Sequence, residues 1–187
     1  MEIILDNDLL QSQNPAIEYG TFWQRLGALL IDSIVIGTIT FPLTFYNIIS
    51  WKSTIILVIA SIIGLAYKPF MEYKYRATLG KMALNLIVAN QQYEPANLME
   101  ILLRNIFHIV PTLVSLVISY SLFSSPEFKD VHSFIDYGAL SQRQGMMNYI
   151  QMVIGFIFIA DGIFLMTDDK KRALHDRIGK TFVIKKR

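Results

Sequence analysis

Apolar residues in this chain gather in four long runs that carry almost no charge. The first and last runs contain one acid each, Asp32 and Asp161, and the third contains no Asp, Glu, Lys or Arg. A helix needs about 20 mostly apolar residues to cross the hydrocarbon core of a bilayer. Four such runs would leave a soluble bundle almost without a polar face. The pattern therefore predicts four transmembrane helices, at residues 26–46, 51–70, 105–123 and 147–166.

Basic residues are unevenly shared between the segments that join these runs. Five lie from Lys68 to Arg104, eight lie in the tail after the fourth run, and three lie in the first and third connections. Membrane proteins carry an excess of Lys and Arg in their cytoplasmic connections. With four spans, the second connection and the tail fall on one side, so we expect both termini to be cytoplasmic. The chain is thus predicted to be a multi-pass protein of the cell (cytoplasmic) membrane.

The start of the chain differs from a cleaved signal peptide. Residues 1–21 contain four acids and no Lys or Arg, whereas a secretory signal begins with a basic segment. We therefore expect the start to be retained. The chain divides into an acidic N-terminal segment at residues 1–19 and one transmembrane domain at residues 20–187.

Two short segments on the expected cytoplasmic side repeat a pattern. Leu79-Gly80-Lys81 precedes the mostly apolar residues 85–89, and Ile178-Gly179-Lys180 precedes residues 181–184. Both segments are rich in residues that favour strands. They could pair as a short cytoplasmic β-ribbon beneath the helices; alternatively, each is a separate interfacial segment. The predicted fold class is an all-α membrane protein of four transmembrane helices, with this ribbon as its one β element.

Composition excludes several classes of protein. Hydrophobic residues make up 53% of the chain, charged residues 17%, and the mean hydropathy is +0.41, whereas disordered or nucleic-acid-coating chains need low hydrophobicity and high charge. The absence of cysteine rules out disulfides, zinc–thiolate sites and cysteine nucleophiles. Only three histidines occur, and no nucleophile stands with a base and an orienting group. We expect no enzyme activity and no bound metal, cofactor or nucleic acid. The expected partners are the lipid bilayer, a second copy of this chain or other membrane proteins.

Three titratable residues fall at similar depths below the cytoplasmic surface. Asp32, Asp161 and His108 lie roughly 10, 8 and 6 Å from the inner ends of their helices, at about 1.5 Å of rise per residue. Groups at one level on three helices could form a cation or proton site. The alternatives are that Asp32 anchors a basic residue and that His108 is a satisfied core histidine. A carboxylate in hydrocarbon is costly, so we expect Asp32 to be buried between helices.

Arg25 and Asp176 are predicted to meet below the helices. Arg25 opens the first run at the inner surface, and Asp176 lies ten residues after the fourth run, close enough to fold back. Asp32 is about 10 Å from Arg25 along a helix, too far for a relaxed salt bridge. An arginine can bind a carboxylate through two parallel hydrogen bonds, which would dock the tail against the first helix. The alternative is that Asp176 caps a local turn and Arg25 reaches the lipid headgroups.

Four motifs follow one another along the chain: residues 22–32, which hold Arg25 and Asp32, then Thr78-Leu79-Gly80-Lys81, then Leu102-Leu103-Arg104-Asn105, and last Leu174-His175-Asp176. Their order and spacing resemble the RDD family of prokaryotic membrane proteins, which is named for one arginine and two aspartates. The resemblance covers about residues 20–184. It identifies Arg25, Asp32 and Asp176 as the named residues, with Gly80, Lys81, Arg104 and His175 in support. One departure is Gly179-Lys180, where the family usually has Ala-Gly.

The resemblance implies a polytopic cytoplasmic-membrane protein, for which transport of an unknown ligand is the usual suggestion. Our leading hypothesis is a transport-related role, such as cation/proton exchange near Asp32 and Asp161. The rival is a non-transporting membrane adaptor or assembly factor, in which the polar residues only hold the helices together. Four spans are few for a complete carrier, and no inverted repeat with broken helices is evident, which favours an oligomer or the adaptor.

Overall fold

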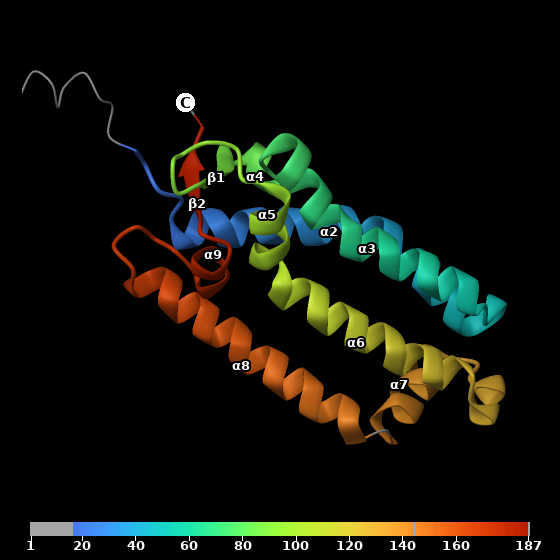
Figure 1. Cartoon of the computed structure of the whole chain (residues 1–187). Helices are drawn as coiled ribbons and strands as arrows, with labels where there is room; N and C mark the ends of the chain where they lie inside the picture. The colour runs from blue at the N-terminus through green and yellow to red at the C-terminus, as the bar shows by residue number, and fades with distance from the viewer. Residues whose placement is uncertain (1–16, 144, 187) are drawn as a thin grey trace, which may run out of the picture.

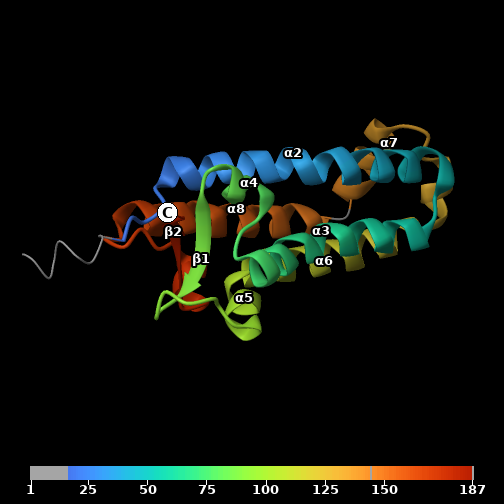
Figure 2. The ribbon, with the colours of Figure 1, turned by 90° about the horizontal axis from the view of Figure 1, so that it is seen from above.

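Four long helices run side by side along most of the molecule (Figure 1). The computed structural model describes residues 17–143 and 145–186. Shorter elements join the long helices at their two ends (Figure 2). The long helices are α2 (Phe22–Tyr46), α3 (Thr54–Tyr75), α6 (Ile106–Phe123) and α8 (Gly145–Thr167). The shorter elements are η1 (Asn47–Trp51), α4 (Leu79–Ala83), β1 (Leu86–Asn90), α5 (Leu98–Arg104), η2 (Pro126–Asp130), α7 (Phe134–Arg143), α9 (Leu174–Ile178) and β2 (Thr181–Lys185).

Within the described residues, three helical segments are long and apolar enough to cross a membrane. They are Phe22–Trp51, which joins α2 to η1, Thr54–Tyr75 and Ile106–Phe123. These three agree with the first three predicted spans. The fourth predicted span falls on α8, a helix of 23 residues whose described apolar part is Met152–Thr167. The fold is therefore a mostly helical one with three candidate spans and a fourth long helix beside them.

Local signals in the sequence explain where α2 begins. The Thr21 hydroxyl accepts a hydrogen bond from the Gln24 N–H at 3.3 Å, and the Gln24 side chain accepts one from the Thr21 N–H at 3.0 Å. This reciprocal capping box satisfies two donors at the helix start. It places Arg25 in the first turn of α2, where its long side chain can reach past the end of the helix.

The two short segments with the repeated pattern do pair as an antiparallel ribbon. β1 aligns with β2 so that Val88 faces Val183. The N–H of Gly20 donates to the Val183 carbonyl at 2.9 Å, so the start of the described chain lies along the other edge of β2. The predicted β-ribbon is thus confirmed. Its inner face forms a small apolar core with α5 and the preceding loop, made of Leu86, Val88, Ala96, Ile101 and Val183.

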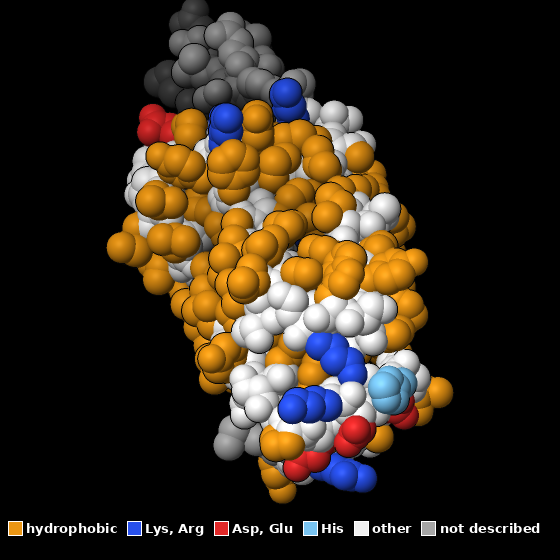
Figure 3. Space-filling model, turned by 90° about the vertical axis from the view of Figure 1, so that its right-hand side faces the viewer, with side chains coloured by type: hydrophobic (Ala, Val, Ile, Leu, Met, Phe, Trp, Pro, Cys, Tyr) orange, Lys and Arg blue, Asp and Glu red, His pale blue; other side chains and the backbone are white. Residues whose placement is uncertain are grey.

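The two ends of the bundle differ in structure. At one end, which we call the ribbon end, β1, β2, α4, α5 and α9 lie together (Figure 1). The opposite, distal end holds η1, η2 and α7 around an apolar core of Ile48, Leu122, Phe128 and Val131. The first and last described residues both lie at the ribbon end, because the four long helices run back and forth between the two ends. Figure 3 shows hydrophobic side chains over the long helices and charged side chains gathered at the two ends.

Candidate functional site

A buried carboxylate, Asp176, holds the tail against the helices at the ribbon end. Its side chain is fully buried and forms ion pairs with Arg25 of α2 and with Arg104 of α5. One of its oxygens also accepts a hydrogen bond from the N–H of Ala173 at 3.0 Å, so Asp176 caps its own short helix as well. The predicted contact between Arg25 and Asp176 is present, and the local cap considered as its alternative is present beside it.

The contact of Arg25 does not have the predicted form of two parallel hydrogen bonds. One guanidinium nitrogen pairs with Asp176, a second donates to the backbone carbonyl of Lys171, and Nε donates to the Gly20 carbonyl at 3.1 Å. The arginine therefore divides its donors among three segments, because Asp176 must share its oxygens with Arg104. Arg25 joins the start of the chain, α2 and the tail in one place.

Arg104 links Asp176 to a second buried carboxylate, Glu72 near the end of α3. Its Nε lies 3.3 Å from a Glu72 oxygen, and its terminal nitrogen also donates to the Thr181 hydroxyl at 2.9 Å. Glu72 is bound further by the ammonium of Lys81 and by the Asn105 amide at 2.9 Å. Sequence reasoning did not single out Glu72. The available signal was an acid just after the second apolar run.

Asp32 is buried between helices, as expected, with 5% of its surface exposed. Its oxygens accept hydrogen bonds from the Tyr67 hydroxyl at 2.7 Å, the Thr78 hydroxyl at 2.6 Å and the Gly80 N–H at 2.8 Å. The basic partner considered for Asp32 is wrong, because these three donors are neutral. The Thr-Leu-Gly-Lys motif thus has a physical role: α4 docks on α2 and supplies two of the three donors.

Gly80 can make this contact because it has no side chain. A Cβ at this position would lie 2.0 Å from the backbone oxygen of Ala28 in α2. The N-terminus of α4 therefore touches the backbone of α2 directly. Close approach of this kind requires glycine.

Gly179 and Lys180, which depart from the family's usual Ala-Gly, lie where α9 meets α5. A Cβ on Gly179 would lie 2.7 Å from the Arg104 Cβ and 2.8 Å from the Glu100 carbonyl oxygen. Lys180 has a φ of 52°, in the left-handed region that favours glycine. In this chain Gly179 allows α9 to lie this close to α5, and Lys180 takes the left-handed backbone conformation.

His175 connects the fourth long helix to the tail. Its Nδ1 lies 2.8 Å from a carboxylate oxygen of Asp161 in α8, and its Nε2 lies 3.2 Å from Asp176. The backbone N–H of His175 also donates to Asp161 at 3.0 Å. The imidazole therefore lies between a carboxylate of α8 and the carboxylate that holds the tail.

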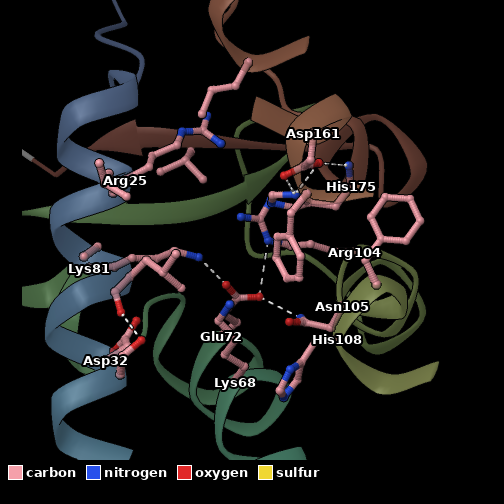
Figure 4. Close-up of a pocket in the computed structure, with 18 of the residues that line it drawn as sticks. Arg25, Asp32, Lys68, Glu72, Lys81, Arg104, Asn105, His108, Asp161 and His175 are labelled. Atoms are coloured by element: carbon pink, nitrogen blue, oxygen red, sulfur yellow. Dashed lines mark hydrogen bonds and ion pairs between the residues drawn. The ribbon is translucent and has the colours of Figure 1, made fainter. Parts of the chain in front are cut away.

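A cavity of about 550 Å³ lies between α2, α3, α6 and α8 above this network. Asp32, His108 and Asp161 all line it, so the structure brings the predicted ion-site residues to one cavity. They do not form one cluster, because His108 contacts the Gly64 carbonyl at 3.2 Å and the two acids have the partners given above. Figure 4 shows Asp32 beside α2 and Asp161 with His175 across the pocket. Among the described residues, no group of three or more acids or histidines could hold a metal ion.

The charges of the network shift the pKa values of its members outside the long helices. Burial opposes the charged form of Asp176, but Arg104 and Arg25 outweigh it and hold the pKa of this carboxyl well below its ordinary value. Burial lowers the pKa of Lys81 to about 8, although Glu72 favours the charged ammonium. Burial also disfavours charge on Arg104, yet Asp176 and Glu72 raise its pKa. At neutral pH the ion pairs that hold the tail are therefore fully charged.

One family model matches this chain: the RDD family, over residues 19–180. The match includes all four long helices, the Thr-Leu-Gly-Lys motif and the His-Asp pair of the tail. No curated protein and no solved structure matches the chain.

Proposed function

Because this chain belongs to the RDD family, we propose that it is a four-span protein of the cytoplasmic membrane with a transport-related role. In this proposal α8 is the fourth span, and the ribbon end faces the cytoplasm. The observation that carries the transport role is the cavity between the long helices, which titratable side chains of α2, α6 and α8 line together. A proton passes through this cavity, in exchange for a cation or with another solute.

Charge supports the proposed orientation. The second connection and the described part of the tail, which lie toward the ribbon end, contain 12 basic residues, while the connections at the distal end contain three. Lys and Arg mark the cytoplasmic side of membrane proteins. α8 runs between the two ends beside α6 (Figure 1), so a fourth crossing returns the tail to the side where the chain begins.

Cysteine labelling tests both the orientation and the fourth span. Glu127 in η2 and Asp169 after α8 are both exposed, and the chain has no cysteine of its own. In intact cells, a membrane-impermeant maleimide is expected to label Glu127→Cys but to label Asp169→Cys only after permeabilisation. Labelling of Asp169→Cys in intact cells would show that α8 does not cross or that the orientation is reversed.

The pair formed by His175 and Asp161 is the group proposed to hold the proton. Both residues line the cavity, and the ring contacts Asp161 through Nδ1 and Asp176 through Nε2. Because both ring nitrogens face carboxylates, a proton gained or lost by this pair would alter one of these contacts. Proton movement would thereby be coupled to the contact between α8 and the tail. Asp32 and His108 are further polar residues that line the same cavity.

Proton flux in liposomes tests the transport role. The purified protein is reconstituted with an internal pH-sensitive dye, a pH gradient is imposed, and sodium, potassium or lithium is added in turn. We expect dissipation of the gradient that depends on the protein. Asp161→Asn removes the carboxylate proposed to hold the proton with His175, so we expect it to abolish this dissipation. Glu127→Gln, at an exposed acid of the distal end, is the matched control and should leave the flux unchanged.

A membrane adaptor is the second candidate function. It is favoured by one observation: Asp32, Glu72, Asp161 and Asp176 already have protein donors on their oxygens, as a purely structural network would have. If the folded protein moves no proton with any of these cations, and Asp161→Asn changes only its stability, the transport proposal is wrong and the adaptor is supported.

A further inference from the structure

One of the basic residues that line the cavity has no ion pair. Arg25, Lys81 and Arg104 each pair with a buried carboxylate, that of Asp176 or of Glu72. Lys68, in the middle of the ribbon half of α3, also lines the cavity. Among the described residues it has no ion pair or hydrogen bond of its own. Its ammonium is therefore the unpaired cation among the described residues that line the cavity.

Most hydrogen-bonding groups of the cavity are already paired, and the ammonium of Lys68 is the exception. The oxygens of Asp32 and Glu72 accept from Tyr67, Thr78, Gly80, Lys81, Arg104 and Asn105. Lys68 retains its three donors, since an ammonium carries three N–H groups. A bare metal cation would find few free oxygens here, whereas an anion would find an unused ammonium. Figure 4 shows Lys68 on the same side of the pocket as Glu72 and His108.

Away from this charged end, the cavity wall is apolar. Leu29 and Ile36 of α2, Phe107 of α6, and Ile157 and Phe158 of α8 line it. Of the two long helices beside it, α8 packs more closely on α6 than on α2. The wall between α2 and α8 is therefore the least closed side of the cavity, and it faces the region that lipid occupies around the long helices.

From these features we infer that the cavity binds a single-chain anionic amphiphile. Its acid group would pair with the ammonium of Lys68, and its chain would lie along the apolar wall toward the gap between α2 and α8. The volume of about 550 Å³ falls within the range of roughly 300–1,000 Å³ that is typical of sites for small ligands. This inference goes beyond the proposed proton movement, because the ligand can bind whether or not a flux is measured.

Equilibrium binding of radiolabelled dodecanoate tests the inference. The full chain is placed in nanodiscs of zwitterionic phosphatidylcholine, and the signal of empty nanodiscs is subtracted. We expect saturable binding of dodecanoate and binding of dodecanol, its neutral counterpart, that is weaker by about tenfold or more, since a hydrogen bond to a charged group is worth about 1.5–3 kcal/mol. Lys68→Ala should weaken dodecanoate to the level of dodecanol. Lys74→Ala, at an exposed lysine of the same helix outside the cavity, should leave binding unchanged.

A second pair of variants tests the place of binding without altering charge. Gly162 lines the cavity, Gly155 does not, and a Cβ added to either residue of α8 meets no atom within 4 Å. Gly162→Leu should therefore fold, fill the cavity and abolish binding, while Gly155→Leu should bind as the unaltered protein does. Equal binding of dodecanoate and dodecanol, or unchanged binding in Lys68→Ala or Gly162→Leu, would overturn the inference. If phosphatidylglycerol in the nanodisc competes for the site as well as unlabelled dodecanoate does, the site belongs to a two-chain lipid. That result would likewise overturn the inference.

Discussion

Replacing Arg104 with alanine is expected to lower the free energy of unfolding by about 3–5 kcal/mol, the range for breaking a buried ion pair by removing one partner. Arg104 is 4% exposed and contacts both Glu72 and Asp176. Its loss leaves two buried carboxylates with fewer cations. Reversible unfolding in mixed detergent micelles measures the change, and hydrogen exchange of residues 172–186 shows whether the tail is released.

The matched control for this prediction is Arg143→Ala. Arg143 is an exposed arginine at the end of α7, far along the chain from the network. Exposed substitutions of this kind usually change stability by less than about 0.5 kcal/mol. A loss at Arg104 no larger than the loss at Arg143 would mean that the network does not hold the tail.

Gly80→Ala is expected to be almost as damaging, although it adds only one methyl group. The new Cβ would meet the Ala28 carbonyl oxygen at 2.0 Å, and backbone cannot move aside as a flexible side chain can. α4 must then shift away from α2, and Asp32 loses the N–H of Gly80 and weakens its contact with Thr78. Overpacking costs about 1–3 kcal/mol and occasionally more, and we expect the upper end of that range because a buried carboxylate also loses donors.

Gly37→Ala, on the same helix as Ala28, separates this clash from a general effect of glycine. A Cβ on Gly37 meets nothing within 4 Å. Alanine is favoured over glycine inside a helix by roughly 0.5–1 kcal/mol, so this variant should be as stable as the unaltered protein or slightly more stable. Similar losses for Gly80→Ala and Gly37→Ala would contradict the direct contact between α4 and α2.

The sequence indicated the helices and the ribbon because each depends on a local pattern. Uninterrupted apolar runs marked α2, α3 and α6, and a repeated Leu/Ile-Gly-Lys pattern marked β1 and β2. The burial of Asp32 followed from the cost of a charge in hydrocarbon alone. These predictions needed no knowledge of which segments fold back on one another.

Most of the contacts between side chains of the buried network could not be predicted from such local patterns. Glu72 and Arg104 come together only after α4, α5 and α9 pack against the ends of the long helices. The pair of Arg25 with Asp176 was predicted, but the sharing of Asp176 with Arg104 was not. Asp32 was considered with a basic partner because the sequence does not show that α4 brings Thr78 and Gly80 to it. The choice of one oxygen or donor over another depends on this tertiary packing.

The central claim is that Asp176 docks the tail onto α2, and a double-mutant cycle with Arg25→Ala and Asp176→Asn tests it most directly. The two residues contact each other across the buried network. Residues in direct contact show coupling energies of about 0.5–3 kcal/mol, so the double variant should lose less stability than the two single variants together. Losses that add to within about 0.3–0.5 kcal/mol, as distant independent sites do, would contradict the claim.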